Sequence, residues 1–265
     1  MLVTVKGDLA NQGTALASTP GALLLVDVDA NGTNTQGTGA QSGATINASF
    51  SGSTVSGVRV FKSFPTVAKQ TSGMSSTLIA QSGIDLYRFS ITANSAGDIA
   101  LNKLVINVST SSGNTTNGTT SVTNLLVKAY TDSAFSNGVA GFTDGQVVAT
   151  ISGLVSNGNN TAALSSILTI PLGQTYYFKV IGDVAQVAGT TNSAGTVTTK
   201  LVGDATYSTG ITTLMGTYAA ALGNFIWSPV STTTPATGNI DWTNGFTVPG
   251  LPSGGTDSFT LTKSS

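Results

Sequence analysis

Short segments in which apolar and polar residues alternate recur along the chain, and this pattern predicts β-strands. In residues 85–93, Tyr87, Phe89 and Ile91 fall on one face, because successive side chains of a strand point to opposite sides. In residues 101–109, Leu104 and Ile106 share a face in the same way. The further segments with this character are 123–131, 145–154, 166–173, 175–184, 196–205 and 257–264.

The expected strands are separated by stretches rich in Gly, Asn, Ser and Thr, which favour turns. Two long polar stretches, 110–121 and 156–163, are expected to be connections. Many short strands with turn signals between them predict an all-β fold of antiparallel β-sandwiches with immunoglobulin-like architecture. A β-barrel is the alternative, since strand pattern alone does not separate the two.

An internal repeat divides the chain. Residues 3–30 align with 177–205, so that Val5-Lys6-Gly7-Asp8 corresponds to Val180-Ile181-Gly182-Asp183 and Asp29 to Asp204. Residues 58–65 resemble 225–232 more loosely. The first 60 residues therefore correspond to the second half of a unit that occurs whole later in the chain. We expect a partial unit at 1–60 and a complete sandwich at 61–265.

A half-sandwich would expose an apolar face and strand edges, which favours association. Two explanations are open. Either the missing strands lie in sequence upstream of residue 1, or a neighbouring subunit supplies them by strand addition or domain sharing. In the second case, residues 1–10 and the strand Leu23–Val28 are expected at the interface.

The composition supports the all-β prediction. Ser and Thr together number 74, and the chain has 18 Asn and 32 Gly. It has no Glu and only 10 Lys plus Arg, which leaves little material for the solvent-facing sides of helices.

Charge and hydropathy limit the possible partners and locations. The net charge of -1 gives no basic surface for phosphates, so nucleic acid is not expected as a partner. No apolar run approaches the roughly 18 to 20 residues of a transmembrane helix. A surface of hydroxyl and amide groups suggests an extracellular or cell-surface location.

Catalytic side chains of the usual kinds are scarce. The chain has no His, Cys or Glu, so the common general bases, thiol nucleophiles and zinc ligands are missing. We expect no enzymatic activity, no catalytic or metal site and no cofactor. Several of the 11 Asp residues stand beside Gly, Ser or Asn, where Asp commonly bonds to turn backbone; these are Asp98, Asp132, Asp144, Asp204 and Asp257.

One stretch, DVDANGTNTQG at 27–37, has part of the spacing of a calcium loop. Asp27, Asp29 and Asn31 fit the first ligands, but the twelfth position is Thr38 instead of a carboxylate. The alignment also places Val202 and Thr206 at the positions of Asp27 and Asn31. A strand end is therefore the simpler interpretation, and calcium is the alternative.

The two tryptophans are the candidates for contact with a sugar ring. Trp227 is flanked by apolar residues, whereas Trp242 stands among turn residues. Large aromatic side chains are more often part of a core than exposed, so burial is expected for both. An exposed Trp242 would instead favour a carbohydrate-binding or adhesin-type module.

Three segments carry a resemblance to a known group of proteins: VKGDLA at 5–10, VRVFKSFPTVA at 58–68 and FIWSPVSTTTPATGNIDWTNGFTVPGLPSGG at 225–255. They resemble immunoglobulin-like repeat units of large secreted cell-surface proteins of candidate-phylum (Patescibacteria-type) bacteria. The resemblance implies an extracellular, cell-surface or filament role and transfers no catalytic residues. The first unit departs from that pattern because its front half is missing.

Together these observations favour a structural subunit of a surface layer or extracellular filament, which assembles as a homo-oligomer or polymer. The alternative is an adhesin-type or carbohydrate-binding module that recognises glycans or a host surface. The sequence leaves open whether the assembly is a sheet, a tube or a fibre.

Overall fold

The computed structural model describes residues 4, 6–9, 20–26, 35–47, 57–111, 120–142, 146–155, 157–186, 195–208, 223–231 and 241–263. All regular elements in these residues are β-strands, and all strand pairs are antiparallel. The all-β prediction is therefore confirmed.

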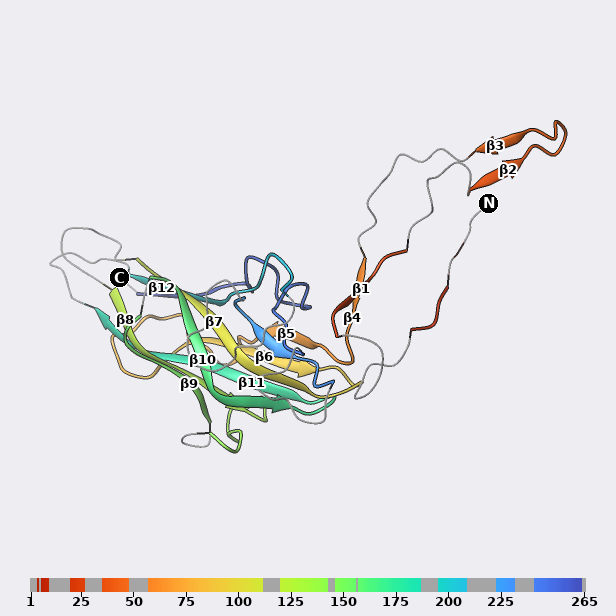
Figure 1. Ribbon diagram of the computed structural model, residues 1–265. Coiled ribbons are helices and arrows are strands. Elements are labelled where there is room, and N and C mark those ends of the chain that lie inside the picture. The colour runs from red at the N-terminus through yellow and green to blue at the C-terminus, as the bar shows by residue number, and fades with distance from the viewer. Residues whose placement is uncertain are drawn as a thin grey trace.

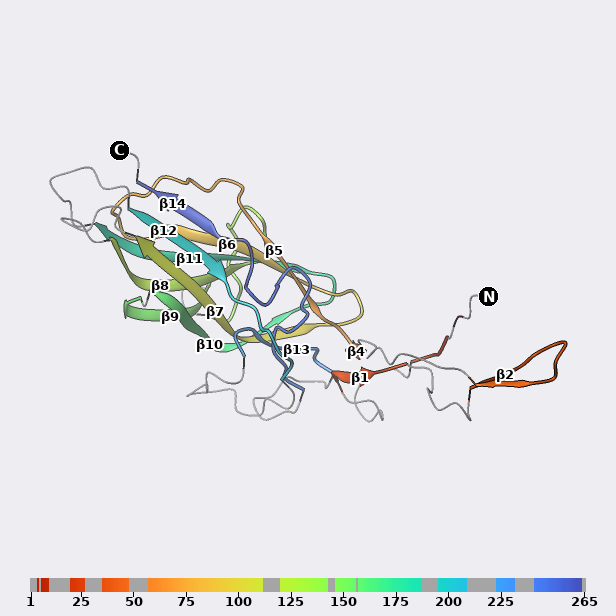
Figure 2. The same cartoon turned by 90° about the horizontal axis from the view of Figure 1, so that it is seen from above.

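Two five-stranded sheets pack face to face and form a β-sandwich (Figures 1 and 2). One sheet has the order β5-β6-β11-β8-β9; the other has the order β10-β7-β12-β14, with β13 also paired to β7. The strands of the first sheet are β5 (Pro65–Lys69), β6 (Ile84–Ala93), β8 (Thr120–Tyr130), β9 (Val147–Leu154) and β11 (Thr175–Gln186). Those of the second are β7 (Ile99–Ser111), β10 (Gly158–Ile170), β12 (Thr196–Leu201), β13 (Ile226–Ser228) and β14 (Phe259–Thr262).

The core between the sheets comes from the alternating positions of the strands. Tyr87, Phe89 and Ile91 of β6 are fully buried, as their period-two spacing predicts. The rings of Phe89 and Phe178, on adjacent strands, stack with centroids 4.9 Å apart. Such cross-strand aromatic pairs stabilise a sheet beyond the apolar area that they bury.

One expected connection is a strand. The polar stretch 156–163 was expected to be a loop, but Gly158 to Ala163 form the first half of β10 and pair with β7. The side chains of Asn160 and Ala162 are buried, and the Asn160 amide donates a hydrogen bond to the carbonyl of Gly158 at 3.0 Å. A buried Asn whose amide is bonded to backbone can occupy an inward position that a hydropathy pattern assigns to a loop.

Strand β7 organises the second sheet because it pairs along both edges. β10 lies on one edge. The other edge is shared by two strands in series: β12 pairs with residues 106–111 and β13 with residues 100–103. Two separate segments of the chain therefore pair with the same edge of β7. β12 and β13 lie end to end along that edge.

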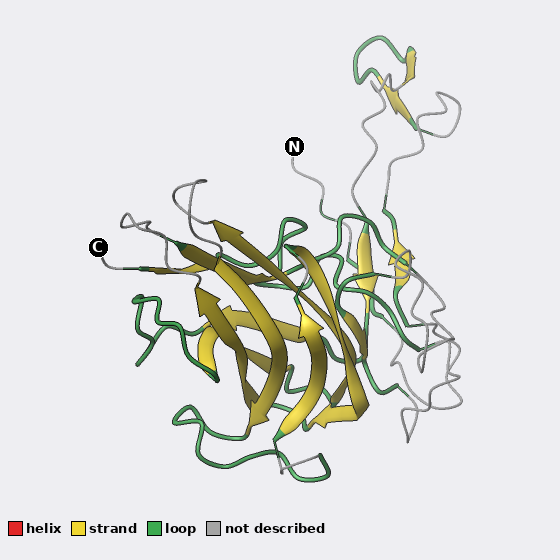
Figure 3. Cartoon of the chain, turned by 90° about the vertical axis from the view of Figure 1, so that its left-hand side faces the viewer, coloured by secondary structure: helices red, strands yellow, loops and turns green. Residues whose placement is uncertain are grey.

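Two small sheets in the N-terminal part of the chain lie outside the sandwich (Figures 1 and 3). In one, β1 (Ala22–Leu24) pairs with β4 (Val58–Val60); in the other, β2 (Gln36–Thr38) pairs with β3 (Thr45–Asn47). We call the first pair the β1–β4 ladder. The immunoglobulin-like topology and the tandem arrangement of units stay predictions.

Candidate interaction site

The β1–β4 ladder exposes an unusual amount of apolar surface. All three residues of β1 are exposed, and the next two side chains, Leu25 and Val26, are 56% and 53% exposed. Val58, opposite Leu24 in the ladder, is 66% exposed. Contiguous exposed apolar side chains of this kind commonly mark an interaction site. We call Leu23, Leu24, Leu25, Val26 and Val58 the apolar strip.

The ladder touches the sandwich through Arg59. Its guanidinium carbon lies 3.5 Å from the centroid of the Tyr207 ring, a cation–π contact. The same guanidinium donates a hydrogen bond to the carbonyl of Gly21 at 2.9 Å. Gly21 has φ 75°, and a Cβ there would lie 1.7 Å from the Tyr207 hydroxyl oxygen. The close fit therefore requires glycine, both for backbone conformation and for space.

The three residues after β4 hold the chain to the sandwich. The ring of Phe61 packs against Trp227 with centroids 5.1 Å apart. The Lys62 ammonium donates to the carbonyl of Val230 at 3.1 Å, and the buried Ser63 hydroxyl donates to the carbonyl of Gly97 at 2.6 Å. The VRVFKS segment is thus the joint between the ladder and the sandwich.

Residues 241–256, which we call the closing segment, seal the same end of the sandwich. The Trp227 indole N–H donates to the carbonyl of Asn244 at 2.8 Å. Gly250 has φ 77°, and a Cβ there would lie 1.8 Å from the carbonyl oxygen of Val67. Leu251 is buried. Asn244, Gly250 and Leu251 of this segment therefore have structural roles.

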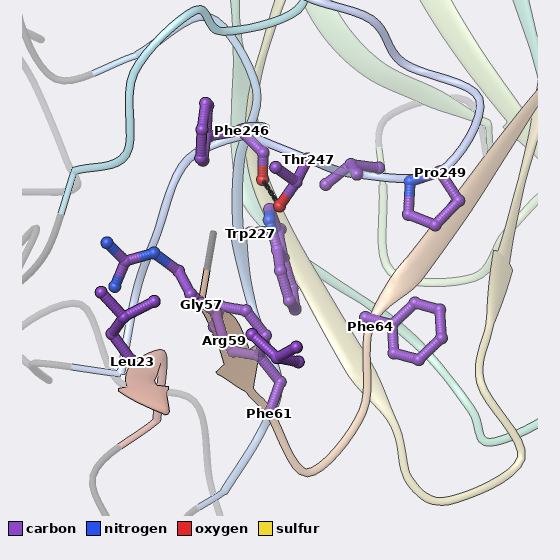
Figure 4. A pocket seen from close by; sticks show the side chains of 11 residues that line it. Leu23, Gly57, Arg59, Phe61, Phe64, Trp227, Phe246, Thr247 and Pro249 are labelled. Atoms are coloured by element: carbon purple, nitrogen blue, oxygen red, sulfur yellow. Dashed lines mark hydrogen bonds between the residues drawn. The ribbon is translucent and has the colours of Figure 1, made fainter. Parts of the chain in front are cut away.

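A cavity of about 450 Å³ lies where the ladder, the joint and the closing segment meet (Figure 4). Its walls are largely apolar, with Arg59 as the charged side chain on its lining. An apolar cavity beside an exposed apolar strip suits insertion of side chains from another polypeptide. The apolar lining includes Leu23, Val58, Phe61, Phe64 and Trp227.

Asp204 is the buried carboxylate that joins the end of β12 to this region. It accepts backbone N–H bonds from Asn224 at 2.7 Å, Phe225 at 3.2 Å and Gly245 at 2.8 Å. Three N–H donors around one carboxylate satisfy its charge without a metal ion. The sequence predicted that Asp204 bonds to the backbone of its own turn; its partners instead lie 20, 21 and 41 residues away in the chain.

Lys103 of β7 is a buried cation close to this carboxylate. Its ammonium donates to the carbonyl of Gly223 at 2.7 Å. Burial lowers the pKa of Lys103 from its ordinary value, and the Asp204 charge partly opposes this effect. Sequence reasoning placed Lys103 on the outer face of β7, which is correct, but the loops that cover it could not be foreseen.

Two further turn predictions can be compared with the structure. Asp132 accepts backbone N–H bonds from Ala134, Ser136 and Asn137. The bond from the Asn137 N–H is the main cause of the lowered pKa of Asp132. Asp98 accepts the N–H of Leu172 at 2.8 Å. Asp132 is therefore a turn carboxylate, as predicted, whereas Asp98 bonds to backbone 74 residues away in the chain. Asp144 lies outside the described residues.

Asp241 is a buried carboxylate that the sequence did not single out. It accepts hydrogen bonds from the Ser228 hydroxyl at 3.0 Å and the Ser231 backbone N–H at 2.9 Å, and also from the Ser231 hydroxyl. These bonds satisfy both oxygens and fix the turn after β13. No local pattern in the sequence predicts hydrogen bonds between Asp241 and serines that lie ten or more residues away.

Both tryptophans are buried, as expected. Trp227 and Trp242 are each 1% exposed. Trp242 packs with Ala100, Ile226 and Val230 in a small cluster on the outer side of β7. Neither ring offers a free face for stacking on a sugar, so the glycan-binding alternative loses the side chain on which it depended.

The proposed calcium residues Asp27, Asp29 and Asn31 lie outside the described residues, and calcium binding there stays a prediction. Of the interface predicted from the sequence, the structure describes residues 4, 6–9 and 23–26, and all of these residues are exposed. Among the described residues, no helix is long and apolar enough to span a membrane.

Comparisons with known proteins give no relative: no protein-family model matches the chain, and no curated protein matches it.

Proposed function

We propose that the chain is a non-enzymatic structural subunit of an extracellular surface layer or filament, in which copies join through the β1–β4 ladder. The single observation that carries this proposal is the apolar strip. It lies on a two-stranded sheet beside the sandwich. An isolated two-stranded ribbon is marginally stable in water, so covering the strip with another subunit would stabilise it.

Two edge strands of the sandwich, β5 and β14, carry protective features that the ladder lacks. The edge strand β5 contains Pro65 and Lys69, and its Val67 N–H is bonded to the carbonyl of Pro249 at 2.9 Å. The edge strand β14 is flanked by residues 76–78, which exchange backbone hydrogen bonds with Thr262. Proline, lysine and covering loops are the usual means by which strand edges are protected. Residues 22–24 contain no proline or lysine, and no backbone hydrogen bond to a covering loop is seen for them among the described residues.

The strand order supports the immunoglobulin-like part of the proposal. In that fold one sheet has the order A-B-E-D and the other contains C-F-G. If β5, β6, β7 and β8 are strands A to D and β11, β12 and β14 are strands E to G, the observed orders are A-B-E-D and C-F-G. Strands β9 and β10 are then additions to the two sheets, β9 beside strand D and β10 beside strand C.

The repeat supports the partial unit at 1–60. Asp29 aligns with Asp204, and Asp204 is bonded to three backbone N–H groups. The aligned position therefore has a structural use in the complete unit, which favours the same use in the partial one. An extracellular location fits a surface of hydroxyl and amide groups with few charges.

Electron microscopy of the purified full chain tests the proposal. We expect ordered sheets, tubes or fibres, and we expect their loss when residues 1–10 are deleted. The control is the variant Leu172→Ser, which replaces an exposed leucine in the turn after β10, away from the ladder. Dispersed single particles from the intact chain under all assembly conditions would contradict the proposal.

A further inference from the structure

Three basic residues lie side by side in one row across the outer face of the first sheet. Lys179 of β11 is directly opposite Arg88 of β6 on one side and Lys128 of β8 on the other. The neighbouring residues Phe178 and Val127 are buried between the sheets, so the three cations share the opposite, solvent-facing side. Because the whole chain has only 10 Lys and Arg residues, this cation row is a marked concentration of positive charge.

The cation row holds more positive charge than the fold neutralises. Asp85 forms an ion pair with Arg88 and also lies 3.8 Å from the Lys179 ammonium, so one carboxylate serves two cations. Among the residues that the structure describes, Lys128 has no ion pair and no hydrogen bond. Like charges directly opposite each other in a sheet are destabilising. The row therefore destabilises the free chain, and a bound anion would offset that effect.

Aromatic side chains adjoin the cation row. The centroid of the Phe135 ring lies 4.7 Å from the guanidinium carbon of Arg88 and 4.9 Å from the ammonium of Lys179. Tyr177 lies on the same face of β11 as Lys179, two residues away, and its ring meets Phe135 edge to face with centroids 6.1 Å apart. Phe135 and Tyr177 are each partly exposed, so both rings are accessible beside the cations.

The turn that carries Phe135 holds its ring in place. Phe135 has φ 56°, a conformation that bulky residues rarely adopt. Asp132 fixes the turn by accepting the backbone N–H groups of Ala134, Ser136 and Asn137, and its oxygens are thereby occupied. The ring is thus positioned over the row before any ligand arrives, and such preorganisation favours binding.

We propose that this face of the first sheet binds an acidic polysaccharide. The acid groups of the polymer pair with Lys128 and Lys179, and the apolar faces of its sugar rings pack on Phe135 and Tyr177. These aromatic rings favour a saccharide over an acidic polypeptide, whose side chains offer no such face. Nucleic acid is disfavoured because it requires many phosphate contacts, whereas the chain has a net charge of -1. The site lies on the sandwich, away from the β1–β4 ladder, and goes beyond the proposed assembly.

Calorimetric titration of the full chain with polygalacturonate tests the proposal. The matched control ligand is the methyl ester of the same polymer, which keeps the sugar backbone and lacks the charges. We expect polygalacturonate to bind, and its affinity to fall as the salt concentration rises, because salt screens charges at a protein surface. The methyl ester should bind at least about tenfold more weakly.

The variant Lys128→Gln separates a binding role from a structural one. It should weaken polygalacturonate binding at least about tenfold. It should also raise the urea midpoint of unfolding, because it removes repulsion from the adjacent Lys179. A lysine with a purely structural role would give the opposite result, lower stability with unchanged binding. The control is Lys200→Gln, which removes the same charge from the outer face of the other sheet, where Lys200 bonds to the carbonyl of Gly254, and should leave binding unchanged.

Several outcomes would overturn the proposal. These are absence of polygalacturonate binding, equal binding of the methyl ester, and unchanged binding by the Lys128→Gln variant. Binding of polyglutamate or of single-stranded DNA as tight as that of polygalacturonate would also overturn it, because the row would then recognise another class of polymer. Assembly is measured separately by microscopy, so the failure of either proposal leaves the other standing.

Discussion

Replacement of Asp204 by alanine should destabilise the sandwich more than its single charge suggests. The substitution removes the acceptor for the N–H groups of Asn224, Phe225 and Gly245. An unsatisfied buried N–H costs about 1–3 kcal/mol. The variant also leaves the buried Lys103 ammonium without the nearby carboxylate charge. We therefore expect a loss of about 3–5 kcal/mol in the free energy of unfolding.

Urea unfolding followed by tryptophan fluorescence measures this loss, because Trp227 and Trp242 are both buried in the folded chain. The matched control is Asp132→Ala. Asp132 also accepts three backbone N–H groups, but at the surface, where water replaces the lost acceptor. A loss for Asp204→Ala below about 1 kcal/mol, or no larger than that for Asp132→Ala, would refute the reasoning.

Three further variants test the closing end and the core. Burial raises the pKa of Tyr87 to about 12 from 10.0, so the folded state holds this proton more tightly than the unfolded state. The resulting stabilisation, roughly 2 kcal/mol, is complete below pH 10 and is lost as the pH rises through 12; Tyr87→Phe should flatten this decline in unfolding experiments. Thr247 has φ 61°, so Thr247→Gly should raise the free energy of unfolding by up to about 1 kcal/mol, and an unchanged or lower value would show that the residue is not strained. A Cβ at Gly250 would overlap the Val67 carbonyl. Gly250→Ala should therefore lower the melting temperature and reduce the free energy of unfolding by about 2 kcal/mol or more. An unchanged melting temperature would contradict the close approach of Gly250 to Val67.

The strands of the sandwich could largely be predicted from the sequence because their period is short and local. The face carrying Tyr87, Phe89 and Ile91 needs only the alternation along one strand. The polar half of β10 was missed because Asn160 is buried through a hydrogen bond that hydropathy does not register. Strands β5 and β13 were not singled out either, since they are short and lie within irregular segments.

The candidate interaction site could be predicted only in outline. The repeat indicated that residues 1–60 form a partial unit, and the apolar run Leu23–Val26 was visible in the sequence. The contact of Arg59 with Tyr207 and the cavity beside Trp227 join segments more than 100 residues apart. Their contact depends on how the closing segment folds back, and no local pattern specifies that.

Light scattering of the full chain over a range of concentrations tests the central claim most directly. The comparison is between the intact chain and the variant Leu23→Ser, Leu25→Ser, Val58→Ser, which removes three exposed apolar side chains and none of the sandwich core. We predict that the mass of the intact chain rises with concentration and that the variant stays monomeric. An intact chain that stays monomeric throughout, or a variant that associates equally well, would contradict assembly through the β1–β4 ladder.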